Sequence, residues 1–334
     1  MQCQLSNNPQ RNKQYSAFLD ACHHGNMTVG DITQFGYKLM RQEKLHPHFF
    51  KGHSLFSNAL YLTCFALGLP YPSDNQKYTN NPITKDNAGK ILALFEERIS
   101  TRRPVEYITQ ECHYLGNKFY VNDHVLIPRS LMNTRFQDFL DNIHWENHRV
   151  LDLCAGSGCI GITLALLNPN ITVDLVDISA NALEVARINI NHYGLQDRVR
   201  CLQSDLFDNV QDKYDLIITN PPYVSEREYE AQAAELKNEP IIALTAGKDG
   251  LDIIHKILAQ SQHYLNPNGT LIAEVGYSVA KLLKQKYRKS PFEWFKARNP
   301  EGESLLDKVI EYFGLLDSVF LCRAQGIPAG IDRK

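Results

Sequence analysis

The sequence predicts an α/β fold, a parallel sheet with helices on both faces, preceded by a smaller helical unit. Two observations carry this prediction. From Arg149 onward, short runs rich in apolar residues alternate with segments whose apolar residues recur at helical spacing, as in a parallel sheet buried between helices. Before residue 103 the apolar residues keep the helical period alone.

The strands and helices of the predicted sheet follow one another along the chain. The expected strands read RVLDLC, TVDLVDI, VRCLQSD, YDLIITN, GTLIAEV, FEWFKA and SVFLCRA. The helices between them include CIGITLALLN, NALEVARININ and GLDIIHKILAQSQHYL. Since an open sheet of this kind binds ligands at the carboxyl ends of its strands, we expect the functional residues to follow these strands.

The chain ahead of the sheet divides into two expected parts. Residues 1–102 form the helical unit, with 1–15 as a mobile arm and with helices at FSNALYLTCFALGLP, closed by Gly68 and Pro70, and at NAGKILALFEERIS. Residues 103–128 are rich in β-branched and aromatic residues and contain the turn pair Gly116-Asn117, so they predict a linking β-hairpin. Residues 129–334 hold the sheet and open with an expected helix, capped by Ser130 and carrying Phe136, Phe139, Leu140 and Ile143.

Composition narrows the class of protein. The chain has 334 residues, 43% of them hydrophobic, and a net charge of -2, which argues against a broadly basic nucleic-acid-binding surface. No apolar run approaches the roughly 18 residues of a membrane helix, and the polar first residues lack a signal-peptide core. The eight cysteines form no C-x-x-C pair, which indicates buried thiols in the cytoplasm. The histidines show no metal-ligand spacing, and we assign no metal.

The stretch LDLCAGSGCIG, residues 151–161, contains three glycines in the G-x-G-x-x-G spacing of a dinucleotide-binding turn. Its surroundings favour a cofactor other than NAD. Asp152 lies inside the strand and Ala155 delays the first glycine, whereas a dinucleotide turn places that glycine directly after the strand. A carboxylate beside the turn suits a cofactor with an ammonium group better than one with a pyrophosphate.

Two further strand ends carry residues suited to a nucleoside. Asp177 ends the second strand, where a carboxylate can accept both hydroxyls of a ribose. After the third strand, Asp205 is placed to accept from an adenine amine, and Leu206 to pack on the ring. The sequence therefore predicts that the glycine loop and these two strand ends hold one nucleoside-containing cofactor.

The fourth strand is followed by Asn220-Pro221-Pro222-Tyr223. The two prolines lack N–H donors, so their carbonyls and the Asn220 side chain form a rigid rim of acceptors. Tyr223 adds a flat wall beside that rim. Such a rim with an aromatic wall is suited to hold a planar NH2 group.

At these residues the chain resembles the S-adenosylmethionine-dependent methyltransferases that modify planar amino groups, and specifically the HemK-like glutamine N(5)-methyltransferases. The resemblance runs from about residue 85 to 326, through RISTRRPVEYIT, FYVNDHVLIPRS, LDLCAGSGCIGI, VDLVDIS, TNPPYV and NEPIIALTAGKDGLD. It implies a Rossmann-like class I methyltransferase sheet, with the helical N-terminal unit recognising the substrate. The cofactor would be S-adenosyl-L-methionine (S-adenosylmethionine).

The resemblance and the strand-end arguments together give the expected site. The cofactor residues are Asp152, Ala155, Gly156, Ser157, Gly158, Asp177, Asp205, Leu206 and Asn220. The substrate amide is expected at Asn220, Pro221, Pro222 and Tyr223, with Asn220, Pro221 and Tyr223 as the catalytic group. Our mechanistic hypothesis is in-line methyl transfer, in which Asn220 Oδ1 and the Pro221 carbonyl hold the two amide hydrogens.

The expected substrate depends on details outside this rim. Release-factor-modifying members usually carry an acidic pair just after IPR, whereas this chain reads IPRSLMNTRF. That element, TAGKDGLD and SPFEWFKA are more similar to the PrmB branch, which acts on a glutamine of the third protein of the large ribosomal subunit, ribosomal protein L3. We therefore expect L3 as the protein partner, possibly within assembling subunits, and neither a membrane nor sequence-specific nucleic-acid binding.

Three other interpretations stay open at this point. They are glutamine methylation in the Gly-Gly-Gln loop of peptide chain release factors, methylation of an exocyclic adenine amine in nucleic acid, and a non-enzymatic assembly factor that keeps the fold. The segment 299–317 is longer than expected between the last two strands and is predicted to form an extra amphipathic helix.

Overall fold

The computed structural model describes residues 5–23, 27–47, 54–72, 74, 76–130, 132, 148–288, 293–296 and 318–323. The chain divides into two compact units. The first contains Met1–Gln110 and Ala233–Asn238, and the second contains Glu111–Gln232 and Glu239–Lys334. Each unit is described by itself.

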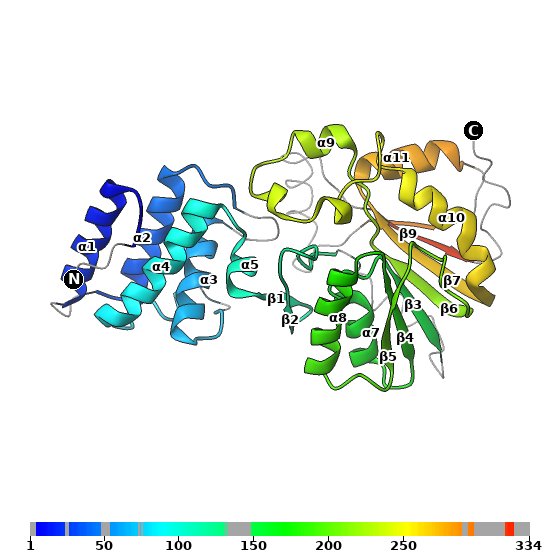
Figure 1. The fold of residues 1–334 in the computed structure, drawn as a ribbon, viewed down its shortest axis with the longest axis horizontal. Helices are drawn as coiled ribbons and strands as arrows, with labels where there is room; N and C mark the ends of the chain where they lie inside the picture. The colour runs from blue at the N-terminus through cyan, green and yellow to red at the C-terminus, as the bar shows by residue number, and fades with distance from the viewer. Residues whose placement is uncertain are drawn as a thin grey trace. The chain divides into compact units, whose positions relative to one another are not determined.

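The described part of the first unit is helical (Figure 1). It contains α1 (Pro9–His23), α2 (Val29–Gln42), α3 (Leu55–Leu67), α4 (Lys85–Thr101) and α5 (Val105–Thr109). The predicted helices at α3 and α4 are confirmed, and Gly68 ends α3 in the left-handed conformation with a φ of 64°, as a C-terminal cap requires. Large apolar side chains from α2, α3 and α4 form its core, among them Ile32, Met40, Leu62, Ile91 and Phe95.

The expectation of a mobile arm over residues 1–15 is wrong for the residues that the structure describes. Helix α1 begins at Pro9, and the buried Tyr15 donates its hydroxyl to Glu96 Oε2 at 2.9 Å. Arg11 pairs with Glu96 and with Glu43. The segment is polar because its side chains pair with other helices of the bundle, and pairing at such sequence distance leaves no periodic signal.

A short segment from far along the chain belongs to this first unit. Glu235 has only 2% of its side chain exposed, pairs with Arg102 at 2.5 Å, and accepts the N–H of His46 at 2.9 Å. Asn238 donates to the carbonyl of Arg102. The helical unit is therefore completed by residues that follow the Asn-Pro-Pro-Tyr stretch, and it extends at its other end to Gln110 rather than to the predicted residue 102.

The second unit opens with the predicted β-hairpin. Strands β1 (Glu111–Tyr114) and β2 (Asn117–Tyr120) pair antiparallel, and Leu115 and Gly116 between them both have positive φ, as a two-residue hairpin turn requires. The hairpin is shorter than the predicted 103–128, since α5 occupies the first part of that range. Pro104 is the N-cap residue of α5, and its carbonyl accepts the first helical N–H groups, those of Tyr107 and Ile108.

A seven-stranded sheet follows, in the order β5-β4-β3-β6-β7-β9-β8. Its strands are β3 (Arg149–Leu153), β4 (Thr172–Asp177), β5 (Val199–Gln203), β6 (Tyr214–Thr219), β7 (Leu265–Val275), β8 (Glu293–Lys296) and β9 (Ser318–Arg323). Strands β3 to β7 are parallel, as predicted. The last two strands differ in direction from the rest, since β9 runs antiparallel to β7 and β8 antiparallel to β9, a feature that the hydrophobic pattern does not encode.

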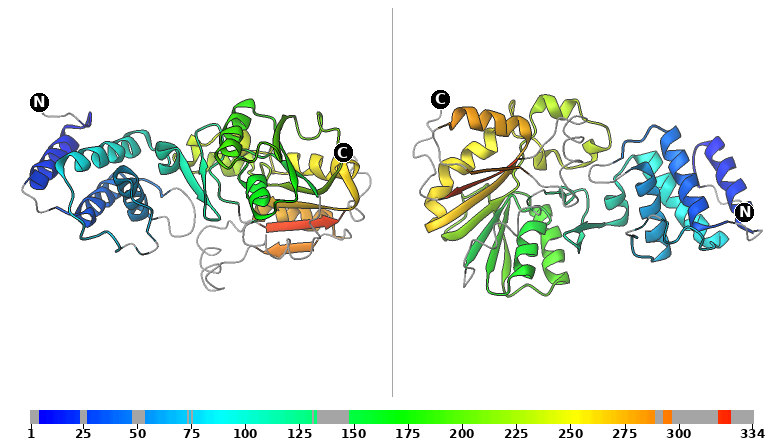
Figure 2. Two further views of the ribbon diagram at one scale, coloured as in Figure 1. Left: turned by 90° about the horizontal axis from the view of Figure 1, so that it is seen from below. Right: turned by 180° about the vertical axis from the view of Figure 1, so that it is seen from behind.

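Helices cover both faces of this sheet (Figure 2). Helices α7 (Cys159–Leu167) and α8 (Ala180–His192) pack on one face, with Val150 and Leu175. Helices α10 (Asp252–Tyr264) and α11 (Tyr277–Lys286) pack on the other, with Leu151 and Val176. The short helices α9 (Glu226–Glu230), η2 (Leu236–Asn238) and η3 (Ile241–Ala243) lie in the long connection after β6.

Two sequence predictions fall outside the described residues. They are the helix after Ser130 with Phe136, Phe139, Leu140 and Ile143, and the extra helix within 299–317. In the ranges that are described, no helix combines the length and the hydropathy of a membrane span.

Candidate active site

The predicted site residues lie at the carboxyl ends of the parallel strands. Leu153 of β3 is in register with Val176 of β4 and with Thr219 of β6, and Thr219 is in register with Ala273 of β7. The chain segments that leave these four parallel strands therefore start side by side. The Thr219 hydroxyl also donates to the Leu153 carbonyl at 2.7 Å, which ties the end of β6 to the start of the glycine loop.

The glycine loop is a tight turn with space above its first glycine. Gly156 and Gly158 have φ values of 54° and 76°, a conformation that favours glycine. A Cβ on Gly158 would lie 2.7 Å from the Leu175 side chain, whereas one on Gly156 would meet nothing within 4 Å. Gly158 is thus required for packing, and Gly156 leaves open room for a ligand against the backbone.

Only one of the two carboxylate oxygens of Asp152 is hydrogen-bonded. Its carboxylate is fully buried, and Oδ2 accepts the N–H of Gly161 at 2.8 Å. Oδ1 is buried with no hydrogen-bond partner. Burial raises the pKa of Asp152 to about 7, and the nearby charge of Asp177 contributes in the same direction. A cationic group bound here would stabilise the carboxylate and satisfy Oδ1.

Asp177 joins the second strand to the glycine loop. Its Oδ2 accepts the N–H of Gly156 and its Oδ1 accepts the N–H of Ser179, both at 2.9 Å. Burial raises the pKa of this carboxyl group as well. Since each carboxylate oxygen has two lone pairs, the group retains acceptor capacity for ribose hydroxyls.

The other residues predicted to bind the cofactor differ in their exposure to solvent. Ala155, Ser157 and Leu206 are buried, whereas Asp205 is exposed. Leu206 has a positive φ of 48° and belongs to the core cluster of the sheet. Placement of an adenine ring against Asp205 and Leu206 stays a prediction.

Two residues near the predicted cofactor site were not predicted from the sequence. Ile178 directly follows Asp177 and is 46% exposed, so an apolar surface lies beside the predicted ribose site. Asn189 of α8 is fully buried and donates to the carbonyls of Ser157 and Tyr120, each at 3.0 Å. An asparagine on the buried face of a predicted helix was the available signal for such a bridging role.

The acceptor rim after β6 holds an unsatisfied atom where the sequence predicts the substrate amide. Asn220 Oδ1 is buried and has no hydrogen-bond partner. Pro221 is buried beside it, and Pro222 is partly exposed. Because buried polar atoms are nearly always paired, this oxygen is available to accept a hydrogen bond from a bound donor.

Tyr223 is held in place by glycines from two other segments. A Cβ on Gly276 would lie 3.0 Å from the Tyr223 ring, and one on Gly250 would lie 2.3 Å from its carbonyl oxygen. The next residue, Val224, donates to the Leu244 carbonyl at 2.8 Å and accepts the N–H of Ala246 at 3.0 Å. The TAGKDG run thus fixes the backbone of the rim, a role that no single-residue argument predicted.

The IPRS element, residues 127–130, is hydrogen-bonded to two buried acidic residues, Glu239 and Glu274. Arg129 pairs with the fully buried carboxylate of Glu239, and Ile127 donates its N–H to that carboxylate. Ser130 donates its hydroxyl to the buried Glu274, the residue after Ala273 in β7. The predicted specificity element is therefore anchored at two acidic side chains of the second unit.

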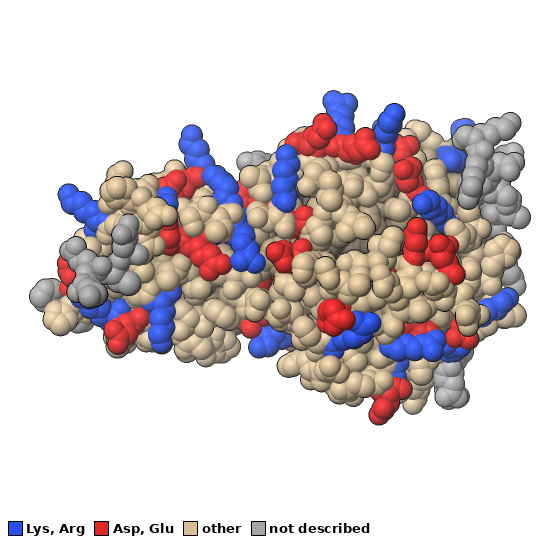
Figure 3. All heavy atoms as spheres, in the orientation of Figure 1, with Lys and Arg blue, Asp and Glu red and all other residues tan. Residues whose placement is uncertain are grey.

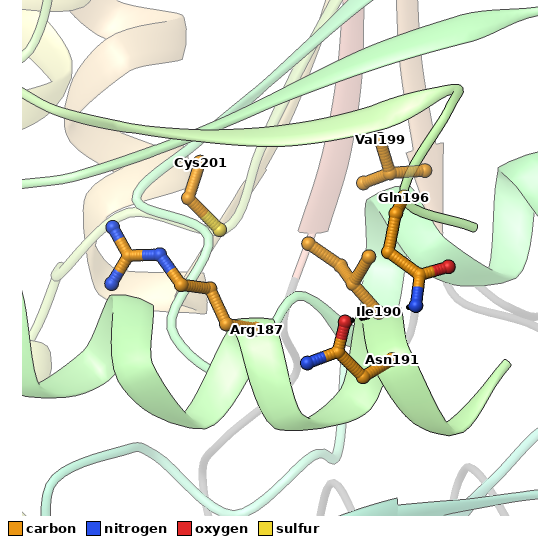
Figure 4. A pocket seen from close by; sticks show the side chains of 6 residues that line it. All are labelled: Arg187, Ile190, Asn191, Gln196, Val199 and Cys201. Atoms are coloured by element: carbon orange, nitrogen blue, oxygen red, sulfur yellow. Dashed lines mark hydrogen bonds between the residues drawn. The ribbon is translucent and has the colours of Figure 1, made fainter. Parts of the chain in front are cut away.

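Other candidate features are located elsewhere. A shallow cavity of about 170 Å³ between α8 and β5 is lined by Arg187, Ile190, Asn191, Gln196, Val199 and Cys201 (Figure 4), and it contains none of the predicted site residues. Basic and acidic side chains are interspersed over the face seen in Figure 3. Among the described residues, no cluster of three or more His, Cys, Asp or Glu has the arrangement to hold a metal ion.

The cysteines beside the glycine loop lie in surroundings that disfavour the thiolate. Burial raises the pKa of Cys159 to about 12 and that of Cys154 still further. Both thiols are therefore neutral and serve as small packed side chains.

Comparison with known proteins decides the family. The chain is similar to the ribosomal protein uL3 glutamine methyltransferase of Neisseria meningitidis serogroup B, with 35% identity over 82% of this chain and 91% of the relative. It is also similar to that of Burkholderia pseudomallei, with 36% identity over 90% of this chain and 96% of the relative. The chain belongs to the ribosomal protein uL3 glutamine methyltransferases.

Membership of this family confirms the resemblance stated from the motifs. The family model described as the methyltransferase small domain matches residues 134–239, which include the glycine loop and the acceptor rim. A solved structure, that of a methyltransferase from Pyrococcus furiosus, is similar with a TM-score of 0.44 and 16% identity, over 66% of this chain and 93% of the other.

Proposed function

We propose that this protein transfers a methyl group from S-adenosylmethionine to the side-chain amide nitrogen of one glutamine in ribosomal protein uL3, in the cytoplasm. The observation that carries the proposal is the buried, unpartnered Oδ1 of Asn220, followed by two residues that lack N–H donors. A primary amide brings two N–H donors to this rim. The curated relatives bear the name of the same reaction.

The residues at the glycine loop fit the proposed cofactor. The unpartnered Oδ1 of Asp152 is an acceptor for the ammonium group, and the open space over Gly156 admits the methionine portion against the backbone. Asp177 is then available to the ribose hydroxyls. We extend the proposed adenine site from Asp205 and Leu206 to the exposed Ile178.

The rim provides orientation and acceptors for the reaction. An amide nitrogen is a poor nucleophile because its lone pair is delocalised, as the roughly 18–20 kcal/mol barrier to amide rotation shows. Asn220 Oδ1 and the Pro221 carbonyl would accept its two N–H groups, which leaves electron density on nitrogen and directs the lone pair to one side. Tyr223 would cover the amide plane and exclude water.

The contribution of these residues to lowering the activation barrier can be estimated. When bound, S-adenosylmethionine supplies a methyl group on a positively charged sulfur, so the C–S bond breaks as the C–N bond forms. Fixing two reactants in line can contribute about 7–11 kcal/mol. Asn220 and Pro221 add a few kcal/mol as positive charge develops on nitrogen, since preorganised dipoles act strongly where charge appears. The extra proton on nitrogen then passes to solvent.

The substrate is tested by parallel labelling reactions. Purified protein is given tritiated S-adenosylmethionine with either free uL3 or a peptide chain release factor, and the labelled residue is located by mass spectrometry. We expect label on one glutamine of uL3, with higher yield before that protein is buried by ribosomal RNA. Label on the Gly-Gly-Gln loop of the release factor alone would overturn the choice of substrate, and label on neither protein would overturn the proposed function.

A further inference from the structure

We propose that Glu239 and Arg129 are positioning residues, which hold the rim around Asn220 and Tyr223 in its reactive shape. This inference rests on the proposed function, because it concerns the same rim. It assigns a task to an ion pair whose residues are not among those predicted to bind the cofactor or the substrate amide.

The two side chains are far apart in sequence, yet both are largely buried and joined by hydrogen bonds. The Glu239 side chain has no exposed surface, and Arg129 is only 16% exposed. Arg129 Nη1 lies 2.8 Å from Glu239 Oε1 and 2.7 Å from Oε2. Oε2 also accepts the N–H of Ile127 at 3.0 Å. One buried carboxylate therefore fixes both the backbone and the side chain of the segment 127–129.

The segment that begins at Glu239 ends on the rim itself. Five residues later the carbonyl of Leu244 accepts the N–H of Val224, and Ala246 donates back to the Val224 carbonyl. Val224 directly follows Tyr223. Residues 239–246 thus run from the ion pair to the backbone of the acceptor rim, so that movement at Glu239 changes the support of Tyr223.

The segment 127–132 closes the arrangement from the other direction. Ser130 Oγ lies 2.5 Å from Glu274 Oε2, and the N–H of Met132 donates to the same oxygen. Glu274 follows Ala273, which is in register with Thr219, the residue before Asn220. The rim is therefore held at two points, through residues 239–246 at Val224 and through β7 beside Asn220, and the Arg129–Glu239 pair links the two supports.

The chain offers a matched pair for comparison at the other end of the sheet. Arg200 contacts Asp174 through Nε at 2.5 Å and through Nη2 at 2.9 Å, and the Asp174 side chain is 7% exposed. This pair has the same chemistry and a similarly buried carboxylate. The Arg200 side chain is 61% exposed, and none of the atoms of the pair lies in the predicted site, so it reports the effect of removing a buried carboxylate that is paired with arginine away from that site.

The test compares Glu239→Gln with Asp174→Asn in the full-length protein. We expect Glu239→Gln to lower kcat for methyl transfer by about 10- to 100-fold, the scale of small misplacements of reacting groups, with the Kd of S-adenosylmethionine within about twofold of wild type. Asp174→Asn should lower the unfolding temperature while leaving kcat within about twofold. Arg129→Lys keeps the cation and should lose less activity than Arg129→Met.

A second readout does not depend on the substrate. Amide hydrogen exchange over residues 221–246 should accelerate in Glu239→Gln and stay unchanged in Asp174→Asn. A Glu239→Gln variant with wild-type kcat and unchanged exchange in this segment would overturn the inference. Equal losses of kcat in both carboxylate variants would also overturn it, as a general stability effect. Absence of methyl transfer by the wild-type protein would instead count against the proposed function, and the exchange measurement would still decide the role of Glu239.

Discussion

The two ends of the parallel sheet carry similar polar side chains that are satisfied to different degrees. Toward the amino end, Asp174 accepts from Arg200 and from the Tyr214 hydroxyl. Asp212 there pairs with Arg149 and Arg200, and the hydrogen bond from Arg149 is the main reason that its pKa falls to about 2. At the carboxyl end, Asp152 and Asn220 each keep a buried oxygen with no partner.

This difference distinguishes polar groups that are paired within the protein from polar groups that are available to a ligand. A buried polar atom without a partner costs about 1–3 kcal/mol, so a fold that leaves two of them at one edge gives up stability there. The cost is recovered when a ligand supplies the missing donors. Charge alone does not distinguish the two ends, because the amino end is also highly charged. The unpaired oxygens of Asp152 and Asn220 support the predicted site because they lie at the strand ends, whereas the buried hydroxyls of Thr163 and Ser261, which also have no partner, belong to helices.

The largest effect that follows from this comparison is expected at Asn220. Asn220→Ala should lower the rate of methyl transfer by about 10²–10³-fold, the usual scale for loss of one positioned polar group. The unfolding temperature should change little, because Oδ1 has no hydrogen bond to lose. Single-turnover kinetics and calorimetry measure the two quantities. Asp212→Asn, at the satisfied end, is the control and should leave the rate unchanged, whereas a near-normal rate in Asn220→Ala would contradict the acceptor rim.

A smaller effect is expected at Asp177. Replacement by alanine should weaken S-adenosylmethionine binding by about 1–3 kcal/mol, because the N–H groups of Gly156 and Ser179 and the ribose hydroxyls all lose an acceptor. Isothermal titration calorimetry measures this change, and NAD serves as a ligand that should not bind. Unchanged affinity in the variant would remove Asp177 from the ribose site.

The smallest effect is a pH dependence at Asp152. With a pKa of about 7 in the folded protein, this carboxyl is partly protonated at neutral pH, whereas an ammonium ligand favours the carboxylate. Affinity for S-adenosylmethionine should therefore rise by about tenfold between about pH 5.5 and 7.5, as a proton is released on binding. Asp152→Asn should bind more weakly and lose this slope, and a variant with the wild-type slope would exclude Asp152 as its source.

The sign of the same shift is opposite for the stability of the ligand-free protein. The pKa of Asp152 is higher in the folded state than the ordinary value of 3.8, so folding favours the protonated form. Its contribution is fully present below that ordinary value and is lost as the pH rises from about 4 to about 7. Thermal unfolding of wild type and Asp152→Asn over this range checks the direction.

The sequence predicts the position of residues at the strand ends where residue type and local position both carry information. Asp177 and Asn220 stand directly after apolar strands, and parallel strands bring such positions together. Short apolar runs between helical segments likewise predicted the strands β3 to β7. This pattern did not show that β8 and β9 run antiparallel, because alternation of side chains is the same in either direction.

The supporting residues could not be predicted from the sequence because their partners are remote. Glu239 and Arg129 are 110 residues apart, and Asn189 and Tyr120 are 69 apart. Nothing in the neighbourhood of either residue distinguishes a buried acid or amide from an exposed one. Likewise α1 was expected to be an arm because the stretch is polar, whereas Tyr15 and Arg11 are held by the distant Glu96.

The way in which Glu235 completes the helical unit limits how this protein can be divided. A fragment that ends at residue 110 would contain the α-helices α1 to α5, yet it would lack the carboxylate that pairs with Arg102 and accepts from His46. A cut at residue 110 therefore removes the acceptor of Arg102 Nη1 and of the His46 N–H, whereas Arg102 Nη2 keeps its hydrogen bond to the Glu43 carbonyl. A transplanted helical unit would therefore have to carry two separate stretches of sequence, Met1–Gln110 and Ala233–Asn238.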